Sequence, residues 1–102
     1  MRGMGNMQQM MKQAQKLQKQ MMEAQEALNE QEFVGVSTND YVKATLSGER
    51  KLKSLDINEA IVDPDDVDML SDMVLMAVND GLEKVAQAHE QTMGRYTKGL
   101  PF

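Results

Sequence analysis

The stretch from Met7 to Leu28, MQQMMKQAQKLQKQMMEAQEAL, contains no Gly, Pro or β-branched residue, which favours one uninterrupted helix. On a seven-residue repeat its inner positions are all apolar, and the positions between them are mostly Gln and Lys. A helix of this length spans roughly 30 Å, against a radius of gyration near 13 Å for a compact domain of this size. We therefore expect it to protrude, and its narrow apolar seam to need a partner, in the first instance a second copy of the chain. The seam consists of Met7, Met10, Ala14, Leu17, Met21, Ala24 and Leu28.

The middle of the chain predicts a three-stranded antiparallel meander. Its strands are expected at residues 33–38, 41–47 and 51–58, with a turn at Thr38–Asp40. In the second strand Val42, Ala44 and Leu46 alternate with Tyr41, Lys43, Thr45 and Ser47, so the apolar set should face the core. Gly48 lies in a hairpin turn, where it can adopt a positive φ. A slip in the alternation between Leu52 and Leu55 suggests a bulge near Lys53–Ser54.

A second long helix should follow, from about Pro64 to Thr97, with Asp63 as its N-cap and Pro64 at its first position. Its apolar face is wide enough to cover a sheet. That face consists of Val67, Leu70, Met73, Val74, Ala77, Val78, Leu82, Val85 and Ala86. The core should depend on Leu46, Ile57, Leu70 and Val74. The fold class is α+β, with a flexible lead over residues 1–6 and a single α-β-β-β-α domain over residues 7–102.

The composition argues against catalysis. The chain has 102 residues, no Cys and a single His, His89, so metal ligation and nucleophilic catalysis lack their usual residues. No cofactor, metal or small-molecule substrate is expected, and the protein is not expected to be an enzyme. The cluster Asp63, Asp65, Asp66 and Asp68 is better explained by helix capping than by calcium binding. Gly81 is expected to mark a close helix crossing. No signal peptide or membrane span is expected.

The formal net charge of −5 conceals a segregation of charge. The first 22 residues hold four basic residues and no acidic one, whereas residues 56–80 hold eight acids and no Lys or Arg. Lys12, Lys16 and Lys19, the lysine stripe, are four and three residues apart, so they share one helix face opposite the seam. This stripe is either a solvated outer face or a contact surface for phosphates, with the amides of Gln8, Gln9 and Gln13 as additional donors. A second basic group comprises Lys43, Arg50, Lys51 and Lys53.

Several motifs in order resemble the YbaB/EbfC family of small bacterial nucleoid-associated proteins. They are MMKQAQ at residues 10–15, VKATLSG at 42–48, MLSDMV at 69–74 and AVND at 77–80, and the resemblance extends from Met7 to Leu100. It implies a tweezer-like homodimer with paired sheets and projecting helices. It also implies cytoplasmic, nucleoid-associated binding of double-stranded DNA with effects on DNA conformation and gene expression. The resemblance further implies DNA contacts on the helical arms, which here indicates the first helix and also the distal second helix, where Arg95 and Lys98 lie.

This sequence departs from the family pattern at Thr38–Asp40, at Asn58-Glu59 and in its short tail after Pro101. None of these positions belongs to the expected contact surface. From the residues alone, a second hypothesis stands beside DNA binding. The Met-rich seam could instead receive a helix of another protein, because Met-rich surfaces adapt to many partners.

Overall fold

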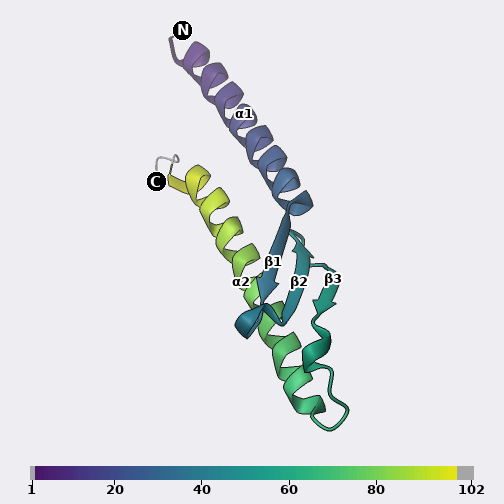
Figure 1. Ribbon diagram of the computed structural model, residues 1–102. Coiled ribbons are helices and arrows are strands. Elements are labelled where there is room, and N and C mark those ends of the chain that lie inside the picture. Colours follow the sequence, from purple (N-terminus) through teal and green to yellow (C-terminus); the bar gives the residue numbers. More distant parts are fainter. Residues whose placement is uncertain (1, 99–102) are drawn as a thin grey trace.

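The computed structural model describes residues 2–98, with side chains described for residues 6–95. One long helix precedes a three-stranded antiparallel sheet in the chain and a second one follows it and packs on it (Figure 1), which confirms the α+β arrangement. Short 3-10 turns at Thr38–Asp40 and Glu59–Ile61 connect the strands and precede the second helix. The main elements are α1 (Arg2–Glu30), β1 (Glu32–Val36), β2 (Val42–Ser47), β3 (Leu52–Ile57) and α2 (Val67–Lys98).

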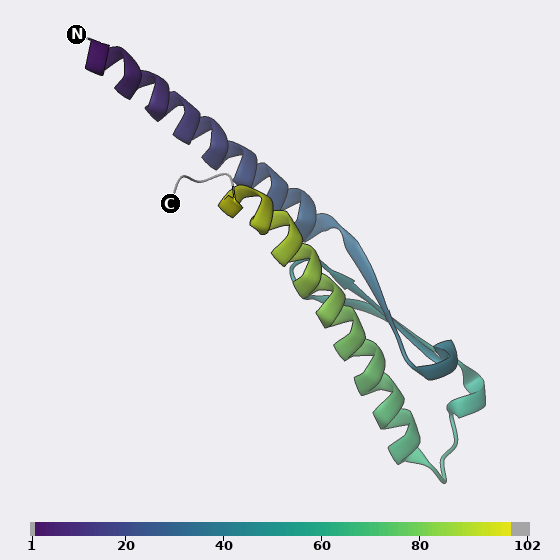
Figure 2. The same ribbon diagram turned by 90° about the vertical axis from the view of Figure 1, so that its left-hand side faces the viewer.

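The molecule is elongated, with principal extents of 79 × 22 × 16 Å. The C-terminal half of α1 lies beside the last turns of α2, and the N-terminal half extends past the end of α2 (Figures 1 and 2). The expected helix start at Met7 is wrong: α1 begins at Arg2 and includes Gly3 and Gly5. Its 29 residues make a rod about 43 Å long.

The seam of α1 is buried to different degrees along its length. Leu28 is buried, and Leu17, Met21 and Ala24 are half-buried, whereas Met7, Met10 and Ala14 are exposed. Because α1 contacts α2, the C-terminal half of the seam already packs within its own chain. The expectation that the whole seam needs a second copy is therefore wrong for this half.

The core lies between α2 and the first two strands. Val42, Ala44 and Leu46 of β2 are buried, as expected, against Ala77 and Val85 of α2. Ile61, which the sequence analysis did not place in the core, is also buried. The other expected core residues, Ile57, Leu70 and Val74, are only partly buried around this cluster. Val67 and Ala86 of the expected apolar face are exposed.

Two glycines allow β1 to approach α2 closely. A Cβ atom on Gly35 would collide with the carbonyl oxygen of Ala77 and the backbone of Gly81, and one on Gly81 would collide with Leu46. The expected close crossing at Gly81 is thus present, but α2 crosses a strand there rather than a helix. A side chain at either position would push the helix away from the sheet.

Three side chains of α2, which we call the edge clamp, bond the backbone at the outer edge of β1 and at the start of the turn that follows it. Lys84 Nζ donates to the carbonyl of Val34 at 2.8 Å, and Asp80 Oδ2 accepts from the amide of Val36 at 2.9 Å. Met76 Sδ accepts from the amide of Thr38 at 3.2 Å. The three clamp residues are four positions apart on the helix, so they lie on one helix face. They bond backbone groups of every second residue from Val34 to Thr38.

The hairpin between β2 and β3 differs from expectation in one respect. The expected bulge is confirmed, because Thr45 pairs with Ser54 and Leu46 with Leu52, leaving Lys53 unpaired. The positive φ, however, belongs to Arg50 at 70° and not to Gly48. Gly48 is required for close approach instead, since a Cβ atom there would collide with the carbonyl of Leu28. Ser47 is buried rather than outward-facing, with its hydroxyl accepting from the amides of the turn.

The second helix starts later than expected, at Val67. Asp66 provides the cap, because its Oδ1 accepts from the amide of Met69 at 3.2 Å. Asp63 closes the preceding turn by accepting from the amide of Asp65 at 2.9 Å. The predicted cap at Asp63 is therefore wrong by one turn, although the capping explanation of the acidic cluster holds.

Candidate nucleic-acid interface

The lysine stripe lies on the exposed face of α1. Lys12, Lys16 and Lys19 are all exposed, on the side of the helix opposite the seam. None of them forms an ion pair with a described residue. The surface therefore carries uncompensated positive charge on a protruding rod, which suits contact with a phosphate backbone.

Polar side chains flank the lysine stripe. Gln8, Gln9 and Gln13 are exposed on the same turns of α1. Their amide groups can donate to phosphate oxygens, a contact that positions a protein on DNA without reading its sequence. The sequence-predicted residues of α1 are thus brought together on one accessible rod.

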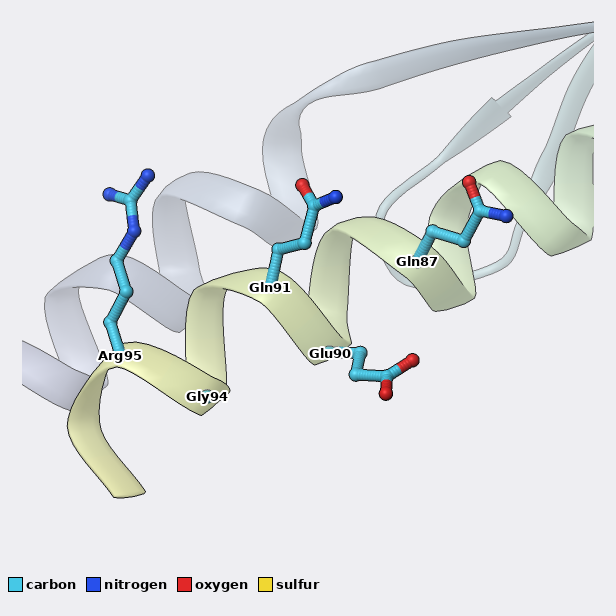
Figure 3. Close-up of a pocket in the computed structure, with 5 residues that line it drawn as sticks. All are labelled: Gln87, Glu90, Gln91, Gly94 and Arg95. Carbon is cyan, nitrogen blue, oxygen red and sulfur yellow. The ribbon is translucent and has the colours of Figure 1, made fainter. Parts of the chain in front are cut away.

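A second polar surface lies on the last turns of α2, around a hollow of about 630 Å³. Gln87, Gln91 and Arg95 project to one side of the helix, and Glu90 points to the other (Figure 3). No ion pair to Arg95 is present among the described residues. Arg95 was expected from the sequence, whereas Gln87 and Gln91 were not, although their four-residue spacing relates them to Arg95. Lys98 belongs to α2, and its side chain lies outside the described residues.

Two of the four residues of the second basic group, Lys51 and Lys53, form ion pairs. Lys53 forms an ion pair with Glu32 at 2.8 Å, and Lys51 approaches Glu49 at 3.7 Å. Lys43 lies opposite Asp56 in the register of β2 and β3. This group offers less free positive charge than the lysine stripe, even though its lysines are also exposed.

The ends of the molecule carry opposite charge. The N-terminal half of α1 forms one end, and the acidic loop before α2 forms the other (Figure 1). Asp63, Asp65, Asp66 and Asp68 are exposed at this second end. DNA would be attracted to the first end and repelled by the second, so the charge distribution favours one orientation on a polyanion.

The side chain of His89 forms a hydrogen bond to the hairpin between β2 and β3. Its Nε2 lies 2.7 Å from the carbonyl oxygen of Gly48, and since a carbonyl only accepts, Nε2 carries the proton. Over the described part of the chain, no group of His, Asp or Glu residues is arranged to hold a metal ion. Within the same residues, neither helix has an apolar stretch of the length that crossing a membrane requires.

Comparison with known proteins gives a consistent result. The model of the YbaB/EbfC DNA-binding family matches residues 4–100. A nucleoid-associated protein of Enterococcus faecalis is 62% identical over 101 residues, which cover 99% of this chain and 97% of that protein. One of Lactobacillus acidophilus is 57% identical, covering 96% and 90% of the two chains. One of Lactococcus lactis subsp. cremoris is 54% identical, covering 97% and 100%. This chain is a member of the YbaB/EbfC DNA-binding family.

Proposed function

We propose that this protein binds double-stranded DNA with little sequence specificity, acts as a homodimer, and alters the conformation of the DNA that it binds. In this role it is a cytoplasmic, nucleoid-associated protein that affects nucleoid organisation and gene expression. The observation that carries the proposal is the lysine stripe, three exposed and unpaired cations on a rod free of acidic residues up to Glu23. Family membership and the names of the relatives support it.

Low sequence specificity follows from the kind of groups on the arm. The ammonium group of lysine acts as a point charge that binds phosphates of any sequence. Reading the bases relies instead on side chains that form paired hydrogen bonds in the major groove. Each neutralised phosphate contributes about −0.9 to the slope of log affinity against log salt. Three lysines on each of two arms therefore give a slope of about −5 at most.

The sheet supports a homodimer through the edge of β3. This strand has no partner on its outer side among the described residues, and α2 packs on β1 and β2 instead. Leu52 and Leu55, which share the inner face with the buried Leu46 and Ala44, are left exposed, as is Leu75 of α2. An open edge beside bare apolar side chains is a site for strand pairing with another chain. Light scattering at micromolar concentration should give twice the chain mass, and a monomer would contradict the dimer.

DNA binding is tested by changing Lys12, Lys16 and Lys19 together to Glu and titrating duplex DNA in mobility-shift assays at several salt concentrations. The variant should lose most of the binding while remaining folded and retaining the oligomeric state of the parent, because the stripe makes no described contact within the fold. The control carries the same charge change on the second basic group, with Lys43, Lys51 and Lys53 changed to Glu. It should retain most of the affinity, and light scattering checks that it keeps the oligomeric state of the parent, because Lys53 lies on β3.

Two outcomes would contradict this assignment. If the stripe variant binds as well as the parent at the same salt, the lysine stripe is only a solvated face. If the control loses binding while the stripe variant retains it, the contact surface lies on the sheet around the second basic group. A parent protein that shows no salt-dependent shift with duplex DNA would overturn the DNA-binding proposal itself.

A further inference from the structure

The base of α1 is held by Gly48, in the hairpin between β2 and β3. A single residue, Gln31, separates the end of α1 from the start of β1. The amide of Gly48 donates to the carbonyl of Gln31 at 2.9 Å, and a Cβ atom on Gly48 would collide with the carbonyl group of Leu28. Leu28 itself is buried. The hairpin therefore contacts the last turn of α1 through backbone atoms, with no side chain between them.

The carbonyl of the same glycine is bonded by α2. Nε2 of His89 donates to the carbonyl oxygen of Gly48 at 2.7 Å, and the two residues are 41 positions apart in the chain. The His89 side chain is half-buried. The end of α1, the hairpin and α2 thus meet at one glycine. We call Gln31, Gly48 and His89 the joint.

A small movement at the joint becomes a large one at the lysine stripe. Lys12 lies 18 residues before Glu30, about 27 Å along the helix axis. A tilt of about 10° at the base would therefore displace it by about 5 Å. The seam residues beside α2, Leu17 and Met21, are only half-buried, and the N-terminal half of α1 extends past the end of α2 (Figure 2). The direction of the lysine stripe thus depends on how firmly the base of α1 is held.

We propose that the joint sets the direction of α1, and that His89 is a positioning residue for the DNA contact of the lysine stripe. The second half of this inference rests on the proposed function, whereas the first half does not. His89 acts through α1, because its hydrogen bond to Gly48 ties the hairpin that holds the helix base to α2. An arm that already points in the binding direction has less conformational freedom to lose when DNA binds, so its affinity is higher.

The first test observes the joint in the parent protein by nuclear magnetic resonance. The chain has a single His, so the imidazole signals belong to His89. Because a carbonyl only accepts hydrogen bonds, the neutral ring should carry its proton on Nε2. That proton should exchange with water slowly enough to give its own signal. A ring proton on Nδ1, or an Nε2 proton in fast exchange with water, would overturn the joint. This measurement requires no variant to fold and no DNA.

The second test measures the direction of α1 as the distance between two spin labels. The chain has no Cys, so labels are attached through Gln9→Cys on α1 and Glu83→Cys on α2, both exposed positions. An excess of unlabelled protein keeps labelled chains apart in an oligomer. His89→Ala removes the donor of the joint, whereas His89→Gln keeps an amide donor near the position of Nε2. The matched control is Asn79→Ala, an exposed change on the same helix.

The parent, the Asn79→Ala control and His89→Gln should each give one narrow distribution of label distances, and His89→Ala a broader one. Circular dichroism checks that every variant is folded at the temperature of the measurement. Equal distributions for His89→Ala and the parent would overturn the joint. Equal broadening in His89→Ala and His89→Gln would also overturn it, since side-chain packing rather than the hydrogen bond would then hold the arm.

The third test titrates duplex DNA with the unlabelled proteins in mobility-shift assays. His89→Ala should bind several-fold more weakly than the parent, with a salt slope shallower by about 0.9 for each phosphate contact that is lost. His89→Gln should restore both quantities. If the label distances broaden in His89→Ala while its affinity stays that of the parent, the positioning role is overturned. A parent that binds no duplex would overturn the proposed function and this role together, whereas the label distances decide the joint independently.

Discussion

The two edge strands of the sheet, β1 and β3, differ in whether the backbone groups on their outer edges have hydrogen-bond partners. The edge clamp of Met76, Asp80 and Lys84 bonds two backbone groups on the outer edge of β1 and the amide of Thr38 just after it. The outer edge of β3 has no strand partner among the described residues, and Leu52 and Leu55 beside it are exposed. An unprotected edge invites pairing with another chain. The fold thus closes one edge with its own helix and leaves the other without a partner among the described residues.

The difference arises from where α2 crosses the sheet. Gly35 and Gly81 let the helix approach β1 at backbone distance, so side chains one turn apart can reach the strand's outer groups. The same placement leaves β3 beyond the helix, since α2 packs mainly on β1 and β2. One close contact therefore determines both the protection of β1 and the exposure of β3.

The strongest way to break this arrangement is Gly35→Val. The new side chain would collide with the backbone of Ala77 and Gly81, and backbone cannot move aside as a flexible side chain can. We expect a loss of about 3 kcal/mol or more in the free energy of unfolding, measured by urea denaturation. The matched change on β3, Ser54→Val, lies on an exposed surface and should alter it by about 0.5 kcal/mol or less. Equal effects of the two changes would show that α2 does not contact β1 as described.

The open edge is tested by Leu55→Lys. Leu55 is 39% exposed, so a lysine at this position stays in water in a monomer. In an apolar dimer interface the same charge would lose its hydration and destabilise the dimer. The dissociation constant of the dimer should rise by about tenfold or more, a change of about 1.4 kcal/mol or more, as measured by sedimentation equilibrium. Val34→Lys, at a similarly exposed position on β1, should leave it unchanged. If Val34→Lys weakens the dimer and Leu55→Lys does not, the interface lies on the β1 side.

A smaller effect is expected when the edge clamp is cut by Asp80→Ala. The amide of Val36 would lose its acceptor and Lys84 its ion-pair partner at 3.2 Å. Because the site is partly exposed to water, we expect a loss of about 1 kcal/mol in stability. On size-exclusion chromatography the same variant should also show a larger fraction of oligomers above the size of the parent protein, since the edge of β1 becomes available for strand pairing. Asp72→Ala, an exposed change on the same helix, is the control and should do neither.

The smallest effect is a pH dependence of the same contact. The hydrogen bond from the Val36 amide, followed by the contact with Lys84, holds the pKa of Asp80 below its ordinary value of 3.8. The folded protein thus binds this proton less readily than the unfolded chain does. The clamp's contribution is therefore complete above pH 3.8 and is lost as the pH falls through the folded-state pKa. The difference in melting temperature between the parent and Asp80→Ala should shrink over that range. A difference that grows on acidification would contradict the clamp.

The secondary-structure elements and their order were predictable from the sequence, apart from where the two helices start. The uninterrupted seam and the alternation at Val42, Ala44 and Leu46 identified α1 and β2 because periodicity reports which side chains share a face. The bulge at Lys53 was visible for the same reason, as a break in alternation. The lysine stripe followed from spacing alone, since residues three and four apart on a helix must lie together.

Which faces and edges are covered depends on how distant parts of the chain pack together. Half of the seam is covered by α2 of the same chain, and Gly48 is needed where α1 meets the hairpin rather than for its own φ. The edge clamp joins residues more than 35 positions apart, which no local pattern reveals. Periodicity shows that a face is apolar or charged, but not what lies against it, because that depends on how distant elements cross. The open edge of β3 therefore became visible only once α2 was placed on the sheet.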